Sequence, residues 1–303
     1  MVRESVLHSV SYSGSWGQAC LTIEQFVDKA SDLGFSGVML MAKRPHLSVL
    51  DTNARARAKL RAQLEQRGLR LACVAGYTNF TADMEHRDIP QREMQIRHVT
   101  ELAEIARDIG GNLVRVFTGY EHPTAPRGEQ WSLIVSSLRE CAERAAGFGV
   151  TVGVQNHHDI ACDYESQFDL IEEVNHPNCR AIFDAWAPAL QCADLRSAAE
   201  KMGAVTVFTT MANYQFRKRF RYRPELVNYE GLIPEVKAVP IDEGFINYGS
   251  FLRTMLTNGY SGPVAYEMCS PLTGGGGCAN LDRCAKKFLK FLKPYHSATE
   301  PSS

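Results

Sequence analysis

The sequence predicts an α/β fold of the (βα)8 barrel type, a TIM barrel built as a single domain. Short apolar runs rich in β-branched residues alternate with amphipathic helical stretches along the whole chain, which is the pattern of a parallel sheet with helical crossovers. Glycine recurs between a helical stretch and the next apolar run, as expected at helix C-caps. With 303 residues, of which 45% are hydrophobic, the chain is long enough for one such barrel and requires no second domain.

Eight apolar runs are predicted as strands, and this number favours a closed barrel over an open sheet. The segment TIEQ after the first strand looks like a helix N-cap at Thr22, with apolar residues at helical spacing behind it, and this helix is predicted to end at Gly34. The predicted strands are residues 6–12, 37–42, 69–75, 113–117, 150–155, 180–184, 205–210 and 263–267.

Residues 213–248 break this rhythm, because they are too polar and too rich in proline for a regular crossover. We expect a long loop after the seventh strand, lying over the barrel mouth and shaping a substrate pocket to which Arg217 contributes. A solvated surface excursion is the alternative. The barrel is expected to span residues 1–295, and the polar tail at 296–303 is expected to be disordered.

Charge and composition argue against nucleic acid and membrane partners. The formal net charge of -1 gives no general electrostatic attraction to phosphate backbones or anionic lipids. No stretch has the roughly 18 apolar residues of a membrane helix, and the first residues lack a signal-peptide pattern, so a cytoplasmic location is expected. The nine cysteines include no CxxC pair and are expected to be reduced and mostly buried. A small-molecule substrate is therefore the better expectation.

Polar residues end the last four predicted strands. Because barrel enzymes build their sites at the carboxyl ends of the strands, Gln155, Asp184 and Glu267 are predicted to converge over the barrel axis. Such oxygen-rich sets suit a divalent ion such as Mn²⁺ or Mg²⁺, and nearby imidazole favours Mn, Fe, Co or Zn. The alternative is that the two carboxylates cap turns or pair with Arg115 or Lys43.

His157 is predicted as the catalytic acid/base. Strand alternation places it on the same side as Gln155 and places His158 on the other side. Imidazole titrates near pH 7, so beside a metal it is well matched to proton abstraction next to a carbonyl. The alternative is a histidine whose hydrogen bonds are satisfied in the core.

The loop after the second strand and three aromatic residues supply further candidates. Lys43, as a catalytic group, and His46, as a substrate-binding group, lie in a donor-rich segment suited to a hydroxyl, carboxylate or enediolate oxygen. A basic helix-entry loop is the alternative. Tyr12, Trp16 and Trp186 are predicted to form an apolar wall against a sugar ring, although aromatic residues are also common in cores.

The last third of the chain carries the most specific resemblance to a family. The segments DEGFINY at 242–248 and GYSG at 259–262, followed by Tyr266 and Glu267, are similar to the sugar phosphate isomerase/epimerase branch of the xylose-isomerase-like barrels. The resemblance covers nearly the whole chain. It implies a TIM barrel enzyme of carbohydrate metabolism.

The same resemblance implies one divalent metal held by Glu, Asp, His and Glu. Asp184 and Glu267 match the second and fourth ligands, and the family mechanism implies a catalytic role for a carboxylate such as Glu267. Gln155 stands at the first position and Thr210 at the third. These four residues form the metal set that the resemblance implies, with two donors weaker than the usual ones.

A second resemblance concerns a subgroup of these barrels. The segments KRPHLSVLD at 43–51, QNHHD at 155–159, GGGG at 274–277 and NLDRCAKKFL at 280–289 look like a group that includes the larger subunits of carbon-glycoside-cleaving enzymes. This resemblance implies metal-assisted proton abstraction and elimination on keto-sugars.

Three functions follow as hypotheses. The first is a metal-assisted isomerase or epimerase of a sugar, keto-sugar or related polyol, in which the ion polarises a carbonyl and His157 moves a proton. The second is a lyase or dehydratase that acts on a keto-sugar or glycoside. The third is a non-catalytic barrel with a degenerate metal site. An endonuclease would need a His-rich zinc cluster and a basic surface, which this chain lacks, and the sequence leaves a homo-oligomer open.

Overall fold

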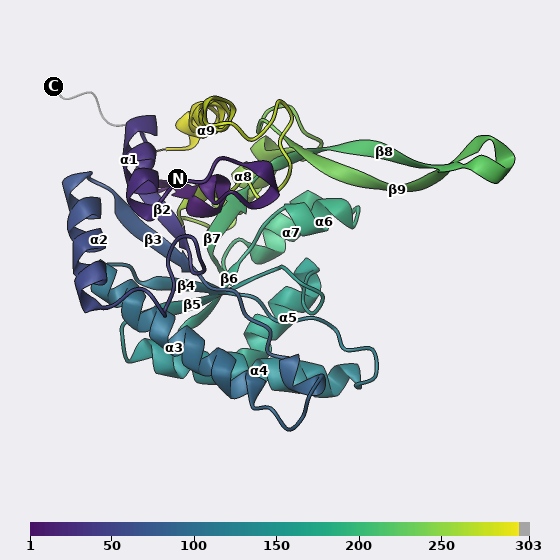
Figure 1. The fold of residues 1–303 in the computed structure, drawn as a ribbon. Coiled ribbons are helices and arrows are strands. Elements are labelled where there is room, and N and C mark those ends of the chain that lie inside the picture. The colour runs from purple at the N-terminus through teal and green to yellow at the C-terminus, as the bar shows by residue number, and fades with distance from the viewer. Residues whose placement is uncertain (297–303) are drawn as a thin grey trace.

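The described residues, 1–296, form a closed barrel of eight parallel strands in a computed structural model of the chain (Figure 1). Around the barrel the strands follow the order β1-β10-β7-β6-β5-β4-β3-β2, so sequential strands are neighbours everywhere except at the insertion after β7. The predicted (βα)8 barrel is therefore confirmed. The barrel strands are β1 (Ser5–His8), β2 (Gly37–Met41), β3 (Arg70–Ala75), β4 (Leu113–Val116), β5 (Thr151–Gln155), β6 (Cys179–Ile182), β7 (Thr206–Met211) and β10 (Val264–Tyr266).

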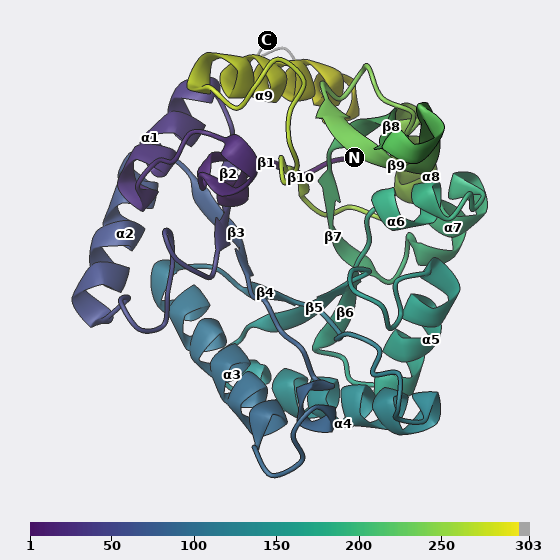
Figure 2. The same cartoon turned by 45° about the vertical axis from the view of Figure 1, so that its right-hand side comes forward.

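Helices form a ring outside the strands, as Figure 2 shows in a view into the barrel. The predicted N-cap is confirmed, because Thr22 and Gln25 form a reciprocal capping box, and the helix ends at Gly34 with a positive φ of 92°. The helices are α1 (Ile23–Leu33), α2 (Ala54–Gln66), α3 (Gln91–Ile109), α4 (Arg127–Ala146), α5 (Tyr164–Val174), α6 (Trp186–Leu190), α7 (Leu195–Met202), α8 (Tyr248–Thr257) and α9 (Cys278–Leu292).

The first strand is shorter than predicted. It ends at His8, and residues 9–12 turn into a short 3₁₀ helix. The reason is a set of side-chain hydrogen bonds: Ser9 Oγ accepts from Met41 N at 2.8 Å, and His8 Nδ1 accepts from Val10 N at 3.2 Å. These bonds replace the backbone pairing that a longer strand would make with β2.

Two apolar cores separate the inside of the barrel from its helical shell. The larger core lies between strands and helices, and the smaller one fills the lumen. Along the strands the side chains alternate between the two, as the period of two requires, except in β3, where a register shift puts both Ala72 and Cys73 in the lumen core. The lumen core consists of Val6, Met39, Ala72, Cys73, Ala75, Leu113, Ile182, Phe208 and Ala265.

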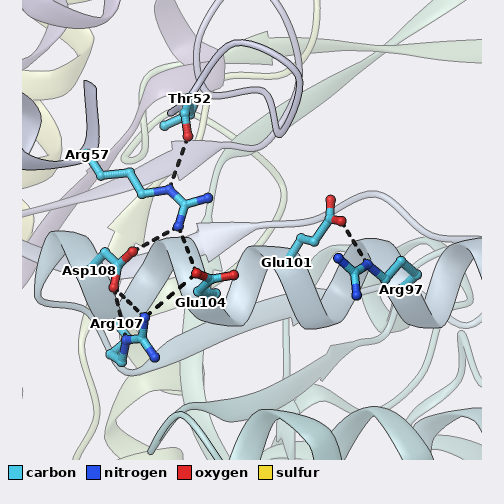
Figure 3. A network of polar contacts seen from close by, with 7 residues as sticks. All are labelled: Thr52, Arg57, Arg97, Glu101, Glu104, Arg107 and Asp108. Carbon is cyan, nitrogen blue, oxygen red and sulfur yellow. Dashed lines mark hydrogen bonds and ion pairs between the residues drawn. The ribbon is translucent and has the colours of Figure 1, made fainter. Parts of the chain in front are cut away.

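Ion pairs on the outer surface link neighbouring helices (Figure 3). Arg57 of α2 donates to Asp108 of α3 at 2.8 Å and lies 3.2 Å from Glu104, while its Nε donates to the carbonyl of Thr52. Arg107 also contacts Asp108 within the same helix. This network fixes the α2 and α3 layer far from the lumen.

The segment after β7 is a long antiparallel ribbon, not the irregular loop that its composition predicted. The strands β8 (Asn213–Arg223) and β9 (Asn228–Val239) pair along their whole length, and the ribbon projects away from the barrel in Figure 1. Alternation puts Phe216, Phe220 and Tyr222 on one face and arginines on the other. The charged residues that suggested a loop thus form the solvated face of a ribbon.

Residues 297–303 lie outside the described part of the chain, so the expected disorder of the tail concerns residues of which the structure says nothing. The first residue of that predicted tail, His296, forms a parallel bridge with Val2. No helix among the described residues has both the length and the apolar character needed to cross a membrane.

Candidate active site

A polar layer lies directly above the apolar lumen, on the side of the strand carboxyl ends. Each of its members comes two positions after a residue that faces the lumen, so the period of two turns all of them inward. The layer consists of Arg115, Gln155, Asp184, Thr210 and Glu267, and the preceding lumen residues are Leu113, Gly153, Ile182, Phe208 and Ala265.

Four of these residues, from four consecutive strands, form one hydrogen-bonded chain. Asp184 accepts from Thr210 through the backbone N at 2.8 Å and through Oγ1 at 2.7 Å. Gln155 Nε2 donates to the same carboxylate. Gln155 Oε1 accepts from Arg115 Nη1 at 2.7 Å. The amide of Gln155 therefore connects a cation to a carboxylate.

Arg115 is a cation buried in the barrel, with 1% of its surface exposed. Its guanidinium carbon lies 4.1 Å from the ring centroid of Phe117 and 4.8 Å from that of Tyr77, and Nη2 donates to the carbonyl of Gly76 at 3.1 Å. Neither Asp184 nor any other described carboxylate forms a direct ion pair with it. The alternative pairing of the site carboxylates with Arg115 is thus indirect, through Gln155.

Glu267 completes the layer from the end of β10. Its Oε2 is buried and has no hydrogen-bond partner among the described residues. Burial raises the pKa of this carboxyl, Arg115 opposes the shift, and the charge of Asp184 adds to it. Burial likewise raises the pKa of Asp184, against the hydrogen bonds from Thr210 and Gln155. Both carboxyls are thus less acidic than in water.

A small cavity of about 30 Å³ opens between these groups. It brings together the four predicted metal ligands, the predicted acid/base His157 and the predicted aromatic wall residue Trp186. It is lined by Gln155, His157, Asp184, Trp186, Thr210, Ala212, Tyr214, Tyr248, Glu267 and Cys269.

His157 and Trp186 both present ring nitrogens at the cavity, and the two differ in their hydrogen bonding. Burial, and next the charges of His158 and Arg115, lowers the pKa of His157 to about 3, so its imidazole is neutral near pH 7. Its Nδ1 accepts from the backbone N of His158 at 2.8 Å, which leaves the proton on Nε2. Trp186 Nε1 is buried without a partner. Besides the amide of Gln155, which already donates to Asp184, the cavity therefore has two N-H donors and one unpaired carboxylate oxygen.

The donor atoms do not fit the four-ligand divalent site that the resemblance implies. Arginine has no acceptor, so Gln155 must turn its oxygen toward Arg115 and its N-H toward the centre, where it cannot ligate an ion. Both oxygens of Asp184 already accept hydrogen bonds. No group of three or more His, Cys, Asp or Glu side chains within residues 1–296 is arranged to hold a metal.

Three predicted substrate residues lie elsewhere. Tyr12 is fully buried, and its hydroxyl donates to Asp282 at 2.8 Å in the helical shell. His46 is buried, with Nδ1 at 3.0 Å from Ser9 Oγ and Nε2 at 3.1 Å from the carbonyl of Leu21. Trp16 is 48% exposed in a turn after β1. The polar atoms of Tyr12 and His46 therefore have partners within the protein, and none of the three residues lines the cavity.

Two predicted cationic residues also lie outside the cavity lining. Lys43 follows β2, with its ammonium 4.2 Å from the ring centroid of Tyr77, on which Arg115 also stacks. Burial, and next Arg115, lowers its pKa. Arg217 lies on the exposed ribbon and contacts Gln215 at 3.2 Å. Lys43 is thus a neighbour of the polar layer, whereas Arg217 belongs to the ribbon.

Sequence reasoning missed several residues of the site. Arg115 had a signal, because a charged residue within the apolar strand LVRV requires a buried partner. Tyr214, Tyr248 and Cys269 line the cavity from segments beyond the barrel strands. They had no such signal, because only the return of the chain to the barrel mouth places them there.

Comparisons with known proteins agree with this architecture. The profile of the xylose isomerase-like TIM barrel family matches residues 27–295. The chain is similar to fructoselysine 3-epimerase from Shigella flexneri, with 21% identity over 250 residues, covering 80% of this chain and 89% of the relative.

Solved structures share the fold at low identity. D-allulose 3-epimerase from Methylomonas sp. matches with a TM-score of 0.73 and 15% identity, covering 97% of this chain and 98% of the other. The probable 3-DHS dehydratase AsbF from Bacillus anthracis matches with a TM-score of 0.70, 17% identity and coverage of 96% and 99%. A xylose isomerase-like TIM barrel protein from Mycobacterium smegmatis, in complex with magnesium, matches with a TM-score of 0.65 and 16% identity, covering 96% of this chain and 95% of the other.

Proposed function

The chain belongs to the xylose isomerase-like TIM barrel family, and from this premise we propose that it is an enzyme that isomerises or epimerises a sugar, keto-sugar or related polyol. The reaction is a proton transfer at a carbon next to a carbonyl. The observation that carries the proposal is the cavity at the strand ends, which is lined by both Glu267, with an unpaired carboxylate oxygen, and Trp186, with an unpaired N-H. A hydroxy-carbonyl compound supplies partners for both.

Glu267 is the proposed base. A buried carboxylate with a raised pKa is a stronger base than one in water, and its free Oε2 faces no competing donor among the described residues. Asp184 is unsuited to this task, because both of its oxygens accept hydrogen bonds. Glu267 therefore removes the proton from carbon, exchanges it with solvent, and protonates the adjacent carbon in an isomerisation.

His157 is the proposed donor to the oxygen that gains charge. With a pKa of about 3 it is a weak base at neutral pH, so its predicted role as the proton-abstracting group is replaced in this mechanism. A neutral imidazole that carries its proton on Nε2 can polarise a carbonyl and stabilise the enediolate. Trp186 Nε1 supplies a second N-H donor in the same cavity.

The divalent ion predicted from the sequence has no step in this mechanism, because the donor atoms of Gln155 and Asp184 do not fit it. The cavity also sets a condition on substrate entry. At about 30 Å³ it is large enough for a water molecule but too small for a sugar, so a sugar enters only when side chains at its rim move. Trp186 and Tyr214, whose ring centroids are 5.5 Å apart, form that aromatic rim.

The decisive experiment follows the proton. A panel of sugars and keto-sugars is incubated with the protein in D₂O, and products are analysed by NMR and mass spectrometry. Deuterium at the carbon next to the carbonyl, with the mass otherwise conserved, supports the proposal. Isomerised product without deuterium indicates hydride transfer and contradicts it.

The lyase or dehydratase is the second candidate, since the same proton abstraction can expel a β-leaving group. The fold similarity to the probable dehydratase from Bacillus anthracis supports this second hypothesis. Loss of water or of an aglycone from the product mass assigns this reaction. If none of the compounds binds or reacts, the third hypothesis, a non-catalytic barrel, replaces both.

Three further expectations stay proposals. They are a single barrel over residues 1–295, a cytoplasmic location and a homo-oligomer. The exposed aromatic face of the ribbon, with Phe216, Phe220 and Tyr229, supports self-association, because apolar faces of this kind favour contact with another protein surface. Light scattering of the purified protein and of Phe220→Ser measures the oligomeric state.

A further inference from the structure

Arg115 occupies an unusual place for an arginine. It is buried at the heart of the barrel, packs against the rings of both Tyr77 and Phe117, and has no carboxylate within ion-pair distance among the described residues. An unpaired buried charge is costly, so such a residue needs a compensating arrangement. Here the arrangement is the chain from Arg115 through Gln155 to Asp184.

The charges of the site indicate what this arrangement replaces. The ligand set implied by the resemblance has three carboxylates and one divalent cation, which together leave one net negative charge. This chain has two carboxylates, Asp184 and Glu267, and the guanidinium of Arg115, which leave the same net charge. With Gln155 in place of a glutamate, the site has one negative charge fewer than the implied ligand set. A guanidinium in place of a divalent ion gives it one positive charge fewer, so the net charge is the same.

The hydrogen bonds complete the correspondence. The two residues that depart from the implied ligand set, Gln155 and Thr210, both donate to Asp184, and an ionised glutamate in place of Gln155 would have no donor for this bond. Together these bonds fix the carboxylate of Asp184, one of the two residues that match the implied ligand set. Each departure therefore has a role in the network around Arg115.

We propose that the guanidinium of Arg115 takes the place of a divalent ion in this barrel, so that the site keeps its charge and geometry without bound metal. Arg115 acts as a positioning residue. It orients Gln155, which orients Asp184, and its charge acts on Glu267. The inference rests on the site described above, but it does not depend on which reaction that site performs.

The first test measures metal in the wild-type protein. Elemental analysis after purification should find less than about 0.1 equivalent of metal. Thermal unfolding is then measured with EDTA and with Mn²⁺, Mg²⁺ or Zn²⁺. We expect no saturable shift in Tm, because an ion that binds the native state raises Tm. One equivalent of metal, with a fall in Tm when EDTA removes it, would overturn the proposal.

The second test removes the cation. Arg115→Met keeps a long apolar side chain but leaves the carboxylates uncompensated, so we expect Tm to fall by roughly 5–10 °C. Because Gln155 is then free to turn its oxygen inward, Mn²⁺ should recover part of that loss in a saturable way. The Tm of Arg115→Lys should lie between those of the wild type and Arg115→Met, and Mn²⁺ should not change it.

The matched control is Arg70→Met on the adjacent strand β3, where the side chain is exposed and paired with Glu4. It should change Tm little and gain no response to Mn²⁺. A folded Arg115→Met that behaves like Arg70→Met contradicts the proposal. If Arg115→Met does not fold, Arg115→Lys and the metal content of the wild type decide. Since both readouts are metal content and Tm, the result is independent of whether a sugar is turned over.

Discussion

The two ends of the barrel differ in a way that volume alone does not reveal. At the amino ends of the strands lies a hollow of about 450 Å³, whereas the cavity at the carboxyl ends measures about 30 Å³. The larger hollow is lined by charged side chains that reach water, such as Arg70, whose side chain is 70% exposed. The smaller one lies beside Arg115, which is 1% exposed.

This difference indicates which of the two hollows is the better candidate for an active site. A charged group in water is screened and contributes little to binding or catalysis, whereas a buried one acts through a low dielectric and has its pKa shifted. The small cavity has unpaired atoms of Glu267 and Trp186, and the large hollow has none of comparable burial except Glu4 Oε2. Burial and unpaired polar atoms therefore locate the site better than size does.

The largest expected effect contrasts one glutamate at each end. Glu267→Gln removes the proposed base and should lower kcat on the substrate found in the D₂O screen by about 10²- to 10⁴-fold. Glu4→Gln, at the other end, should leave kcat unchanged. Steady-state kinetics on both variants make the comparison, and equal losses would mean that Glu267 has no special role.

The next contrast uses two threonines on β7. Thr210 donates to the carboxylate of Asp184, whereas Thr206 donates to the neutral carbonyl of Met202 at 2.7 Å. Hydrogen bonds to charged groups contribute more, so Thr210→Val should lower the free energy of unfolding by about 1.5–3 kcal/mol and Thr206→Val by about 0.5–1.5 kcal/mol. Urea denaturation measures both, and a reversed order would show that the network around Asp184 adds no stability.

The pH dependence of stability offers a third contrast. Because the folded-state pKa of His157, about 3, lies below the ordinary value of 6.5, its contribution is fully present above pH 6.5 and is lost as the pH falls toward 3. At pH 5 the loss amounts to about 2 kcal/mol. Thermal unfolding of His157→Asn should therefore show a flatter decline between pH 6.5 and 5 than the wild type, and parallel curves would contradict this.

The smallest effect is expected for Arg180→Ala at the large hollow. Arg180 donates to the carbonyl of Ala204 at 2.9 Å in an exposed position. Its removal should change the free energy of unfolding by less than about 0.5 kcal/mol, as is usual for surface substitutions. If Arg180→Ala lowers the free energy of unfolding as much as Thr210→Val does, the two ends of the barrel do not differ in the way proposed.

Much of the fold followed from local patterns. The alternation of apolar runs and helical stretches predicted every barrel strand, and the N-cap at Thr22 predicted where α1 begins. Arrangements that depend on distant partners escaped prediction. Tyr12 reaches Asp282, which is 270 residues away, and His46 reaches Ser9 and Leu21. No local property of a tyrosine or histidine distinguishes such a contact from a substrate-binding role.

The sequence by itself determined the barrel and the polar layer, because strand periodicity turns Gln155, Asp184 and Glu267 inward wherever they end apolar strands. The tertiary structure alone decided what these residues do together. An amide has a donor end and an acceptor end, and the choice between them depends on what stands opposite each. For Gln155 the neighbour is Arg115, which lies 40 residues earlier in the chain and reaches it only when β4 and β5 pair.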